Sequence, residues 1–259
     1  MNKSAIITGA SSGIGKALAF ELARNGYDLF LTARNEDALQ NVADECVKKI
    51  GVKVEIFTAD LADSGATGVL IKAIAKRRFD VLVNNAGFGV KGNFAETNIT
   101  EELEMLNVQL AAMLRLTKAV LPEMIEHKGG KILNIASVYS FSPVPMQAAY
   151  SASKAFMLSF SSALQDELKE TNIQVSVVCP GITQTEFRTR AGIADKKNSG
   201  MTAEKVAAIA FAEMSKGKHV IVPGFQNKVF AFVSKHLPPS LITKFIRVIN
   251  NIRGVNKKN

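Results

Sequence analysis

The chain has 259 residues, of which 47% are hydrophobic and 21% charged, a composition that excludes a disordered or membrane-spanning protein. Its net charge of +9 would suggest nucleic-acid binding, but 9 of the 32 basic residues and no acidic residue follow Glu213. Residues 1–213 are therefore neutral, with 23 basic and 23 acidic groups, and we expect no nucleic-acid partner.

The sequence predicts neither a targeting segment nor a disulfide framework. No apolar run reaches the length of a bilayer helix, and a strand-like run begins already at Ser4, so we expect no signal peptide. The two cysteines, Cys46 and Cys179, do not suggest a disulfide framework. These features predict a protein of the reducing cytoplasm.

The N-terminal stretch predicts a cradle for a diphosphate. Residues 4–8 form a short strand, residues 9–15 (GASSGIG) a glycine-rich turn, and residues 16–26 an amphipathic helix. Glycines allow tight turns and close approach of the backbone, and the free N–H groups at a helix N-terminus attract an anion. This strand, turn and helix therefore favour a nucleotide-binding site.

Three named motifs compete for this turn. The spacing G-x-G-x-x-G is not met, and a P-loop would need Gly at Ala10 and Ser or Thr at Ala17. The hydrolase elbow G-x-S-x-G is formally matched with Ser11 as nucleophile, but it requires earlier strands upstream. Its partner would be one of the chain's histidines, which are His127, His219 and His236. A serine hydrolase is thus a remote alternative.

The ends of the next two strands bear on the choice of nucleotide. Residues 28–34 predict a strand that ends at Arg34, where NAD-binding folds place an acidic residue for the ribose 2′-OH. An Arg suits a 2′-phosphate, so the sequence favours NADP(H), with an ordinary surface Arg as the alternative. Residues 53–61 predict a third strand whose last residues, Asp60 and Leu61, meet an adenine ring. The alternative is that Asp60 caps the next helix.

The following segments extend the alternation of strands and helices. A helix over about residues 64–78 leads to a continuous apolar strand at 79–83, the pattern of a strand buried on both faces. It runs into Asn84-Asn85-Ala86-Gly87, whose small and polar side chains let a ligand lie against the strand end. The pattern predicts a doubly wound parallel sheet.

A long helix is predicted over about residues 100–127, starting near Thr100 and kinked or divided at Pro122. Within it, Asn107 lies among apolar neighbours in the sequence, where a polar side chain must find partners. It is either a satisfied core amide or part of a proton path.

The strongest chemical signal lies between residues 131 and 154. An apolar strand at 131–136 ends at Ser137, and a helix then begins near Tyr150. Tyr150 and Lys154 are four residues apart and share a helix face, where an ammonium group would lower the pKa of a phenol. With the Ser137 hydroxyl nearby, these groups are suited to protonating an oxygen while hydride reaches carbon. A half-buried Tyr beside a surface Lys is the plainer alternative.

The remaining segments complete an open α/β sheet. A strand at 173–179 is followed by Pro180 and Gly181, a turn that fits the mouth of a ligand site. Residues 184–201 are polar and suggest a mobile lid, Thr202 caps a further helix, and residues 219–223 form a last strand.

With these motifs in order, residues 4–223 resemble a short-chain dehydrogenase/reductase. The motifs that carry the resemblance are Thr8-Gly9-x-x-x-Gly13-x-Gly15, Asn84-Asn85-Ala86-Gly87, Ser137, Tyr150-x-x-x-Lys154 and Pro180-Gly181, with Asn107 at the fourth catalytic position. The resemblance implies an α/β protein with a three-layer doubly wound Rossmann fold, a seven-stranded parallel sheet and a C-terminal helical extension. It places a single catalytic domain at 1–224 and the extension at 225–259.

The resemblance also implies roles. Tyr150 would be the general acid in reduction, and Ser137 would bind the carbonyl. Lys154 would hold the nicotinamide ribose and lower the Tyr150 pKa, while Asn107 would keep a water molecule in the proton relay. The residues it assigns to NADP(H) are Gly9, Ser11, Ser12, Gly13, Ile14, Gly15, Arg34, Asp60, Leu61, Asn85, Ala86, Gly87, Tyr150, Lys154, Pro180, Gly181, Thr183 and Thr185. No metal site is expected.

Partners follow from the same likeness. Family members are commonly dimers or tetramers that use the helix before Pro122 and the Tyr150 helix, so we expect a homo-oligomer. Residues 225–254 form two amphipathic segments divided by Pro238-Pro239, and either cap the substrate cleft, join subunits or lie on a membrane surface.

The expected activity is NADP(H)-dependent interconversion of a ketone or aldehyde with an alcohol, with a mild preference for a lipophilic, acyl-chain or sterol-like substrate. A nucleotide-binding regulatory or scaffold protein without chemistry is the alternative from another class.

Overall fold

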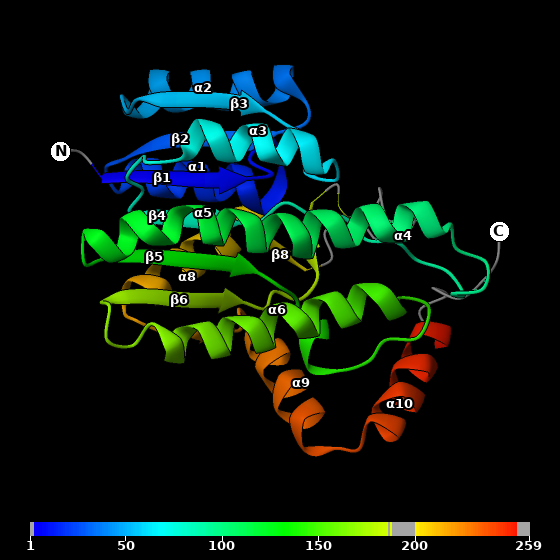
Figure 1. The fold of residues 1–259 in the computed structure, drawn as a ribbon. Coiled ribbons are helices and arrows are strands. Elements are labelled where there is room, and N and C mark those ends of the chain that lie inside the picture. Colours follow the sequence, from blue (N-terminus) through cyan, green and yellow to red (C-terminus); the bar gives the residue numbers. More distant parts are fainter. Residues whose placement is uncertain (1–2, 186, 188–199, 253–259) are drawn as a thin grey trace.

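A computed structural model describes residues 3–185, 187 and 200–252, with side chains described up to residue 248. Its main sheet has seven parallel strands in the order β3-β2-β1-β4-β5-β6-β9 (Figure 1). The strands are β1 (Lys3–Thr8), β2 (Tyr27–Ala33), β3 (Val54–Thr58), β4 (Val81–Asn84), β5 (Gly130–Ile135), β6 (Ile173–Val178) and β9 (Val220–Ile221). The predicted seven-stranded parallel sheet is confirmed.

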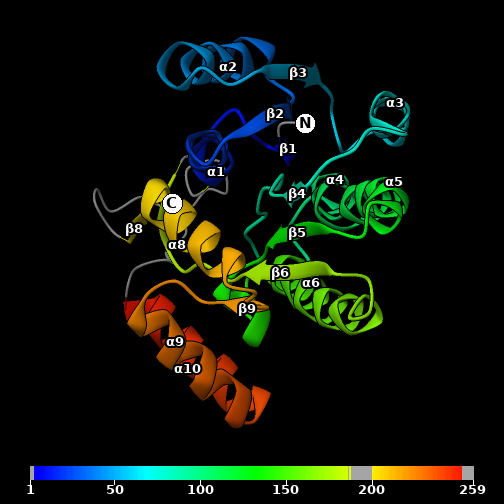
Figure 2. The same cartoon turned by 90° about the vertical axis from the view of Figure 1, so that its left-hand side faces the viewer.

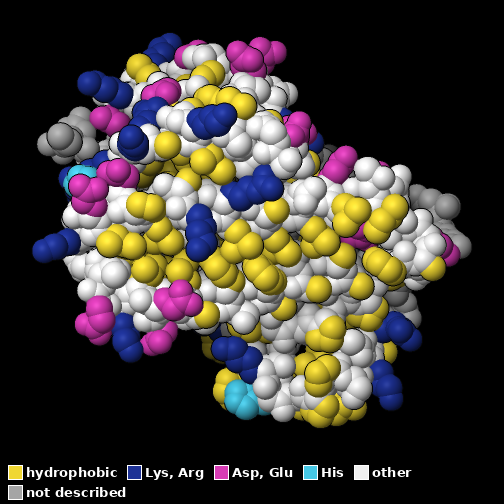
Figure 3. Space-filling view, in the orientation of Figure 1, with side chains coloured by type: hydrophobic (Ala, Val, Ile, Leu, Met, Phe, Trp, Pro, Cys, Tyr) yellow, Lys and Arg dark blue, Asp and Glu magenta, His cyan; other side chains and the backbone are white. Residues whose placement is uncertain are grey.

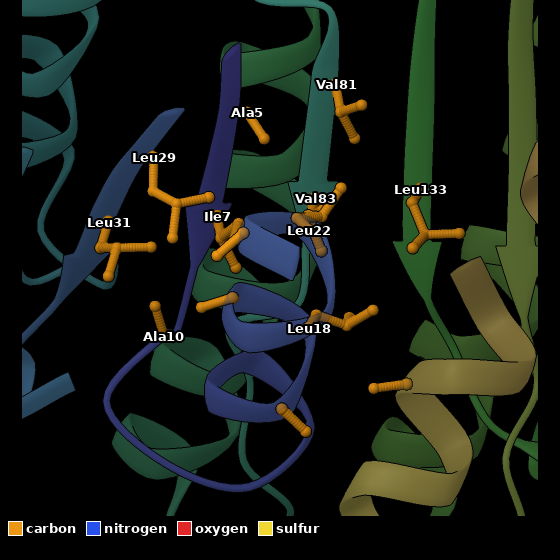
Figure 4. Close-up of a cluster of buried hydrophobic side chains, with 14 of the residues drawn as sticks. Ala5, Ile7, Ala10, Leu18, Leu22, Leu29, Leu31, Val81, Val83 and Leu133 are labelled. Carbon is orange, nitrogen blue, oxygen red and sulfur yellow. The ribbon is translucent and has the colours of Figure 1, made fainter. Parts of the chain in front are cut away.

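Helices cover both faces of this sheet and give three layers (Figures 1 and 2). On one face lie α1 (Gly13–Arg24), α2 (Glu36–Ile50) and α8 (Ala203–Ser215), and on the other α3 (Ser64–Ile74), α5 (Ala112–Glu126) and α6 (Ala148–Glu167). Alternate residues of each strand supply the two cores. In β1, Ala5 and Ile7 pack toward α1 (Figure 4), whereas Ile6 packs on the opposite face.

The order of strands sets the position of the site. The chain winds outward from β1 to β3 and then returns to place β4 on the other side of β1. Helices therefore diverge at the carboxyl ends of β1 and β4, the switch point where open α/β sheets bind ligands. A small separate pair, β7 (Thr183–Gln184) with β8 (Met201–Thr202), lies after β6. Thr202 caps α8 as predicted, by accepting a hydrogen bond from the Lys205 N–H.

The predicted long helix differs from the structure in three places. It begins as α4 (Ile99–Leu106), one residue before Thr100, and the side chain of Asn98 caps it. A π-helical segment, η1 (Asn107–Ala111), then joins α4 to α5. Helix α5 continues through Pro122 to Glu126, so the predicted division at Pro122 is wrong. The break in regular helix lies at Asn107, where the wider π turn changes the helical phase.

Three boundaries elsewhere are shorter than predicted. Helix α3 ends at Ile74, because Ala75 leaves the helical conformation and Lys76 has a positive φ of 59°. Strand β3 ends at Thr58, and the last strand covers only Val220 and Ile221. Of the predicted lid at 184–201, residues 186 and 188–199 lie outside the described part of the chain.

Two further helices, α9 (Phe225–His236) and α10 (Pro239–Ile252), follow the sheet and form a hairpin at its edge (Figures 1 and 2). Helix α9 contacts the short helix η2 (Val138–Phe141), which directly follows β5. Ile242 and Ile246 of α10 pack on Val144 in the loop that leads to α6. The extension is thus joined to the segment that carries Ser137 and Tyr150.

Candidate active site

The structure brings Ser137 and Tyr150 together at the carboxyl end of the sheet. Ser137 follows β5 and begins η2, where its Oγ accepts a hydrogen bond from the Tyr139 N–H at 3.2 Å. Tyr150 lies in the first turn of α6, with its phenol near the Ser137 hydroxyl, which acts to lower the pKa of the phenol. Two hydroxyls that lie near each other at a strand end can bind one carbonyl oxygen together.

Lys154 lies one turn further along α6 and is buried, with 4% of its surface exposed. Its Nζ donates to the Ile135 carbonyl oxygen at 3.1 Å and lies 5.6 Å from the centre of the Tyr150 ring. The predicted four-residue spacing therefore places amine and phenol on the same helix face. Ser140 fixes this turn, because its Oγ donates to the Lys154 carbonyl oxygen at 2.8 Å.

Burial governs the protonation of both groups. Desolvation raises the pKa of Tyr150 above its ordinary value of 10.0, and the Ser137 hydrogen bond offsets only part of this rise. Desolvation also lowers the pKa of Lys154 from 10.5 to about 7. We predicted that the charge of Lys154 lowers the Tyr150 pKa. In the chain without a cofactor this prediction is wrong. The effect of desolvation on the phenol outweighs the charge of an amine that is itself about half neutral at pH 7.

The fourth predicted catalytic residue, Asn107, is not part of this cluster. Its side chain is exposed and donates to the Ala62 carbonyl oxygen at 3.4 Å. The expectation of a polar group enclosed by apolar neighbours is wrong here, because the π-helical segment turns Asn107 away from the core.

Gln109 is the amide that this segment buries against α6. It is only 1% exposed, and its Oε1 accepts from Ser153 Oγ at 3.0 Å. Its Nε2 donates to the Phe88 carbonyl oxygen at 2.5 Å, and Ser153 Oγ also bonds to the Tyr150 carbonyl oxygen at 2.7 Å. One feature of the sequence could have indicated that Gln109 is buried. Gln109 falls in the helical phase of the buried residues Met105, Ala112, Met113 and Leu116, whereas Asn107 does not.

The glycine-rich turn is held against the end of β4. The backbone N–H groups of Asn85 and Ala86 donate to Thr8 Oγ1 at 2.9 and 3.0 Å. The Asn85 side chain donates to the carbonyl oxygens of Thr8 and Gly9 at 2.9 and 3.1 Å. A Cβ at Gly15 would collide with the Gly9 carbonyl oxygen and the Asn85 amide, so this packing requires glycine.

Asn84, by contrast, is part of the core. Its Nδ2 donates to Asn134 Oδ1 at 2.8 Å and contacts Thr117 Oγ1 at 3.3 Å, joining β4 to β5 and α5. The motif at 84–87 thus divides into a buried structural amide and a turn that faces the glycines.

The N-terminus of α1 fits a diphosphate. Its N-cap, Ser12, makes no side-chain capping bond in the described structure, and the first turn contains no acidic residue. Helices α2 and α3 are instead capped by the side chains of Asn35 and Asp63. The first-turn N–H groups of α1 are thus available to an anion, and the helix dipole favours one there.

Arg34 and Asp60 meet at the far end of this cradle. Arg34 Nη1 lies 3.8 Å from Asp60 Oδ2, and both side chains are about half exposed. Asp60 Oδ1 accepts from the Ala62 N–H at 2.9 Å, and the cap of α3 is Asp63, so the alternative in which Asp60 caps that helix is wrong. Leu61 is buried beside this pair.

The turn after β6 closes the other side. The Pro180 carbonyl oxygen accepts from the Val138 N–H at 3.0 Å, which ties this turn to η2. Thr183 Oγ1 donates to the Gly181 carbonyl oxygen at 3.1 Å. Thr185 lies beside Gly13, because a Cβ at that glycine would be 3.1 Å from the Thr185 methyl. Three motifs predicted to bind the cofactor therefore lie next to one another: the glycine-rich turn, the turn after β4 and the turn after β6.

Apolar side chains surround Tyr150 on the remaining sides. The Tyr139 ring meets it edge-on at 6.4 Å, and the Phe187 ring lies 5.8 Å away. Val90 and Met105 complete this cluster. Tyr139 also borders the cluster that contains Ile242 and Ile246 of α10, so the C-terminal hairpin extends the apolar wall.

The hydrolase alternative finds no support in the histidines. His127 is bonded to the Glu123 carbonyl oxygen, His236 to that of Phe232, and His219 to Ser162 and the Val175 carbonyl oxygen. None of these bonds reaches Ser11, so none of the three histidines, all in the described part of the chain, is bonded to that nucleophile.

Comparison with known proteins agrees with this geometry. The family model described as short chain dehydrogenase matches residues 3–196. The ketoacyl reductase HetN of Nostoc sp. is 31% identical over 90% of this chain and 82% of its own length. A very-long-chain 3-oxoacyl-CoA reductase of Laccaria bicolor is 38% identical over 66% of this chain, which spans 52% of that protein.

Among solved structures, a short-chain dehydrogenase from Sphingobium yanoikuyae in complex with NADPH superposes with a TM-score of 0.83 and 29% identity, covering 99% of this chain and 97% of that one. The fold, the glycine cradle and the matched family model lead to one conclusion. This chain belongs to the short-chain dehydrogenase/reductase family of oxidoreductases, whose fold binds a nicotinamide cofactor.

Proposed function

We propose that this protein is an NADPH-dependent reductase of lipophilic ketones, acting on an acyl chain or a molecule of similar polarity. The observation that carries the proposal is that the Ser137 and Tyr150 hydroxyls lie near each other at the strand end, beside a cluster of apolar side chains. The same groups can run the reverse reaction on a secondary alcohol.

In this mechanism Ser137 and Tyr150 hold the substrate oxygen between their hydroxyl groups. A bound reduced nicotinamide supplies the hydride for the carbonyl carbon. Tyr150 then donates its phenolic proton to the oxygen, and its raised pKa keeps that proton in place at neutral pH until donation. The phenolate left behind is stabilised by Ser137 and by the protonated form of Lys154.

Lys154 and Gln109 position the acid. Lys154 is suited to hold the ribose hydroxyls of the cofactor while its charge faces the Tyr150 ring. Gln109 bonds to Ser153, which in turn bonds to the Tyr150 carbonyl oxygen, so Gln109 rather than Asn107 takes the fourth position in our proposal. A water molecule held near this amide would restore the proton to Tyr150.

Support for NADP(H) over NAD(H) comes from the end of β2. Arg34 presents a half-exposed guanidinium group there, which can bind a 2′-phosphate as a bidentate donor. The opposing carboxylate of Asp60, 3.8 Å away, moderates this preference. The structural neighbour from Sphingobium yanoikuyae contains NADPH.

Support for a lipophilic substrate comes from the approach to Tyr150. Aromatic and aliphatic residues of the 138–147 segment, of α10 and of the loop after β4 line it. An apolar substrate gains binding free energy from this surface, whereas a strongly polar one would lose its hydration. Two similar proteins are named for reduction of ketoacyl and 3-oxoacyl-CoA groups.

A homo-oligomer is supported by the outer face of α4, α5 and α6. The exposed large apolar residues there are Ile99, Leu103, Ile125 and Phe156. Figure 3 shows hydrophobic side chains gathered across this face. Burial against a second copy would remove this surface from water, and sedimentation velocity measures the resulting mass. Cytoplasmic location stays a prediction from the sequence.

Replacement of Tyr150 by Phe tests the reaction. We expect NADPH to bind with a Kd within about twofold of wild type, while kcat for a medium-chain ketone falls roughly 100- to 10,000-fold, the contribution of general acid catalysis. Tyr139→Phe is the matched control, because it removes a neighbouring phenol whose ring touches Tyr150. Unchanged turnover in Tyr150→Phe would refute the role of Tyr150. Failure of the wild type to oxidise NADPH with any member of a broad carbonyl panel would favour the scaffold alternative.

A further inference from the structure

The hairpin of α9 and α10 carries several large apolar side chains that are exposed to solvent. On α9, Phe225, Val229, Phe232 and Val233 recur at the spacing of a single helix face, and this face is opposite to the buried Ala231 and Ser234. Phe225 is 80% exposed and Phe232 65% exposed.

Helix α10 has a second stripe of the same kind. Leu241, Phe245 and Val248 are spaced by four and three residues, and Phe245 is 61% exposed. Ile242 and Ile246, which are buried on Val144, lie on a neighbouring face. Each helix of the hairpin therefore uses one side for packing and presents another apolar side outward.

The charges on the hairpin have one sign. Lys228, Lys235, Lys244 and Arg247 are exposed, and no acidic residue occurs in the sequence after Glu213. At the 100° rotation per residue of an α-helix, Lys228 and Lys244 each lie about 40° beyond the edge of the apolar stripe on their helix. Lys235 instead lies over the Phe141 ring at 5.1 Å. Figure 3 shows hydrophobic side chains on this lobe with basic ones at its margins.

We propose that the α9–α10 hairpin docks on the surface of a lipid bilayer that contains anionic lipid. Exposed phenylalanines beside lysines on amphipathic helices suit the boundary between headgroups and acyl chains, where long cationic side chains reach the phosphates. No helix in the described part of the chain is long and apolar enough to cross a membrane, so the contact is peripheral.

The charge pattern favours a bilayer over a second copy of this chain. Two copies paired through this hairpin would bring cations against cations, with no carboxylate on either helix to neutralise them. An anionic membrane supplies the complementary charge, and each Lys or Arg near its surface strengthens binding about fivefold.

Docking here would have a consequence for substrate entry. The inner side of the hairpin contacts Val144 and Tyr139, and the Tyr139 ring touches Tyr150. A docked protein would thus hold the apolar approach to Tyr150 near the bilayer. This consequence rests on the proposed function, whereas the docking itself does not.

Flotation of the full-length chain with vesicles tests the docking. The vesicles are phosphatidylcholine alone and phosphatidylcholine with phosphatidylglycerol. The apolar variant combines Phe225→Ser, Phe232→Ser and Phe245→Ser, and the charge variant combines Lys228→Gln, Lys244→Gln and Arg247→Gln. Matched controls carry changes at comparably exposed positions on other surfaces, Val47→Ser with Val69→Ser and Phe94→Ser, and Lys48→Gln with Lys72→Gln and Lys118→Gln.

We expect the wild type and both controls to float with anionic vesicles and to dissociate as salt is raised. The charge variant should lose roughly 100-fold in partitioning, at about fivefold per cation, and the apolar variant should bind neither vesicle. Unchanged NADPH binding and unchanged reduction of a water-soluble ketone show that both variants are folded. A wild type that does not float, or controls that lose as much binding as the test variants, would overturn the proposal. The proposal would also be overturned if the wild type formed a dimer that is lost only in the apolar variant, while neither the wild type nor any variant floats. The exposed apolar surface would then be an interface with a second copy of the chain.

Discussion

Lys154 is the residue whose chemistry depends most on its surroundings. Its sequence position predicted a cation beside Tyr150, yet burial lowers its pKa to about 7 and raises that of the phenol. Desolvation disfavours both charged forms, and it wins because neither side chain reaches bulk water. The four-residue spacing predicted correctly that the two side chains share a helix face. It did not predict that the Tyr150 pKa is raised and not lowered.

A pH dependence follows from this burial. Lys154 loses its charge as the pH rises through about 7, so the phenolate formed by proton donation becomes less stable and kcat for ketone reduction should fall. The expected profile bends near pH 7 and declines above it. Lys154→Met should remove the bend. Lys131→Met is the control, because burial also lowers the Lys131 pKa, but at the opposite end of β5. A flat wild-type profile between pH 6 and 8 would contradict the assignment.

The same shift has a linked effect on stability. The folded protein binds the Lys154 proton less tightly than the unfolded chain, whose amine has its ordinary pKa of 10.5. The unfolded state therefore holds more protons between about pH 7 and 10.5, and the contribution of this group to stability rises with pH across that window. Below about pH 7, where Lys154 is charged in both states, burial of the charged amine destabilises the folded protein by its full amount.

Arg34 and Asp60 together determine cofactor choice in our proposal. Arg34→Ala should weaken NADPH binding about 10- to 100-fold, the value of a charged hydrogen bond of about 1.5–3 kcal/mol, and leave NADH unchanged. Asp60→Asn should raise the preference for NADPH, because it removes the carboxylate 3.8 Å from the guanidinium. Isothermal titration with both nucleotides measures the ratio, with Arg24→Ala at the end of α1 as control. Equal losses for NADPH and NADH in Arg34→Ala would disprove the preference.

At the scale of elements, the π-helical segment η1 determines which of the two amides, Asn107 or Gln109, is buried. Regular periodicity over residues 100–127 predicted one helix and could not show that the phase changes at Asn107. The extra residue in the turn leaves Asn107 exposed and buries Gln109. π-Helical turns are frequent at functional sites, which agrees with this placement.

Replacement of each amide by Leu separates the two assignments. Gln109→Leu should lower kcat about tenfold and increase the solvent isotope effect, with Kd for NADPH unchanged, because the Ser153 link to the Tyr150 turn is lost. It should also cost about 1–3 kcal/mol of stability, since the Phe88 carbonyl oxygen loses its donor. Asn107→Leu should change kcat less than twofold, because a side chain this exposed loses little. A larger kcat loss in Asn107→Leu than in Gln109→Leu would restore the original assignment.

The strand ends were the most predictable elements. Buried parallel strands read as continuous apolar runs, and the glycines and polar residues that follow them mark turns at one edge of the sheet. This is why Gly9, Asn85, Ser137 and Pro180 could be grouped before any contact was known. Helix ends were less certain, because caps such as Asn98 and Asp63 compete with nearby polar residues for the same role.

At the scale of the whole molecule, the C-terminal hairpin links two surfaces. Its inner side, Ile242 and Ile246, closes the apolar wall near Tyr139, and its outer side carries exposed phenylalanines. The sequence showed amphipathic segments here and left three uses open. The contact with Val144 supports a cap over the substrate approach, which does not compete with the proposed membrane contact.

Substitution of Ile246 by Asp tests the cap. A carboxylate at this buried position should detach α10 from Val144 and raise KM for a long-chain ketone about tenfold, through lost apolar contact area. KM for a short ketone and binding of NADPH should stay within about twofold, because the main sheet does not depend on α10. Leu241→Asp, on the exposed stripe, is the matched control. Equal effects on long and short ketones would argue against a role of α10 in substrate binding.

The sequence by itself determined the family, the parallel sheet, the glycine cradle and the Ser137, Tyr150 and Lys154 positions. Each of these depends on local spacing and on the period of buried residues, which one chain displays directly. Only the tertiary structure decided that Gln109 is buried against Ser153 while Asn107 is exposed, that the phenol is less acidic than usual, and that α10 packs on Val144 beside Tyr139. Those outcomes depend on desolvation and on contacts between segments far apart in the chain, which no local pattern encodes.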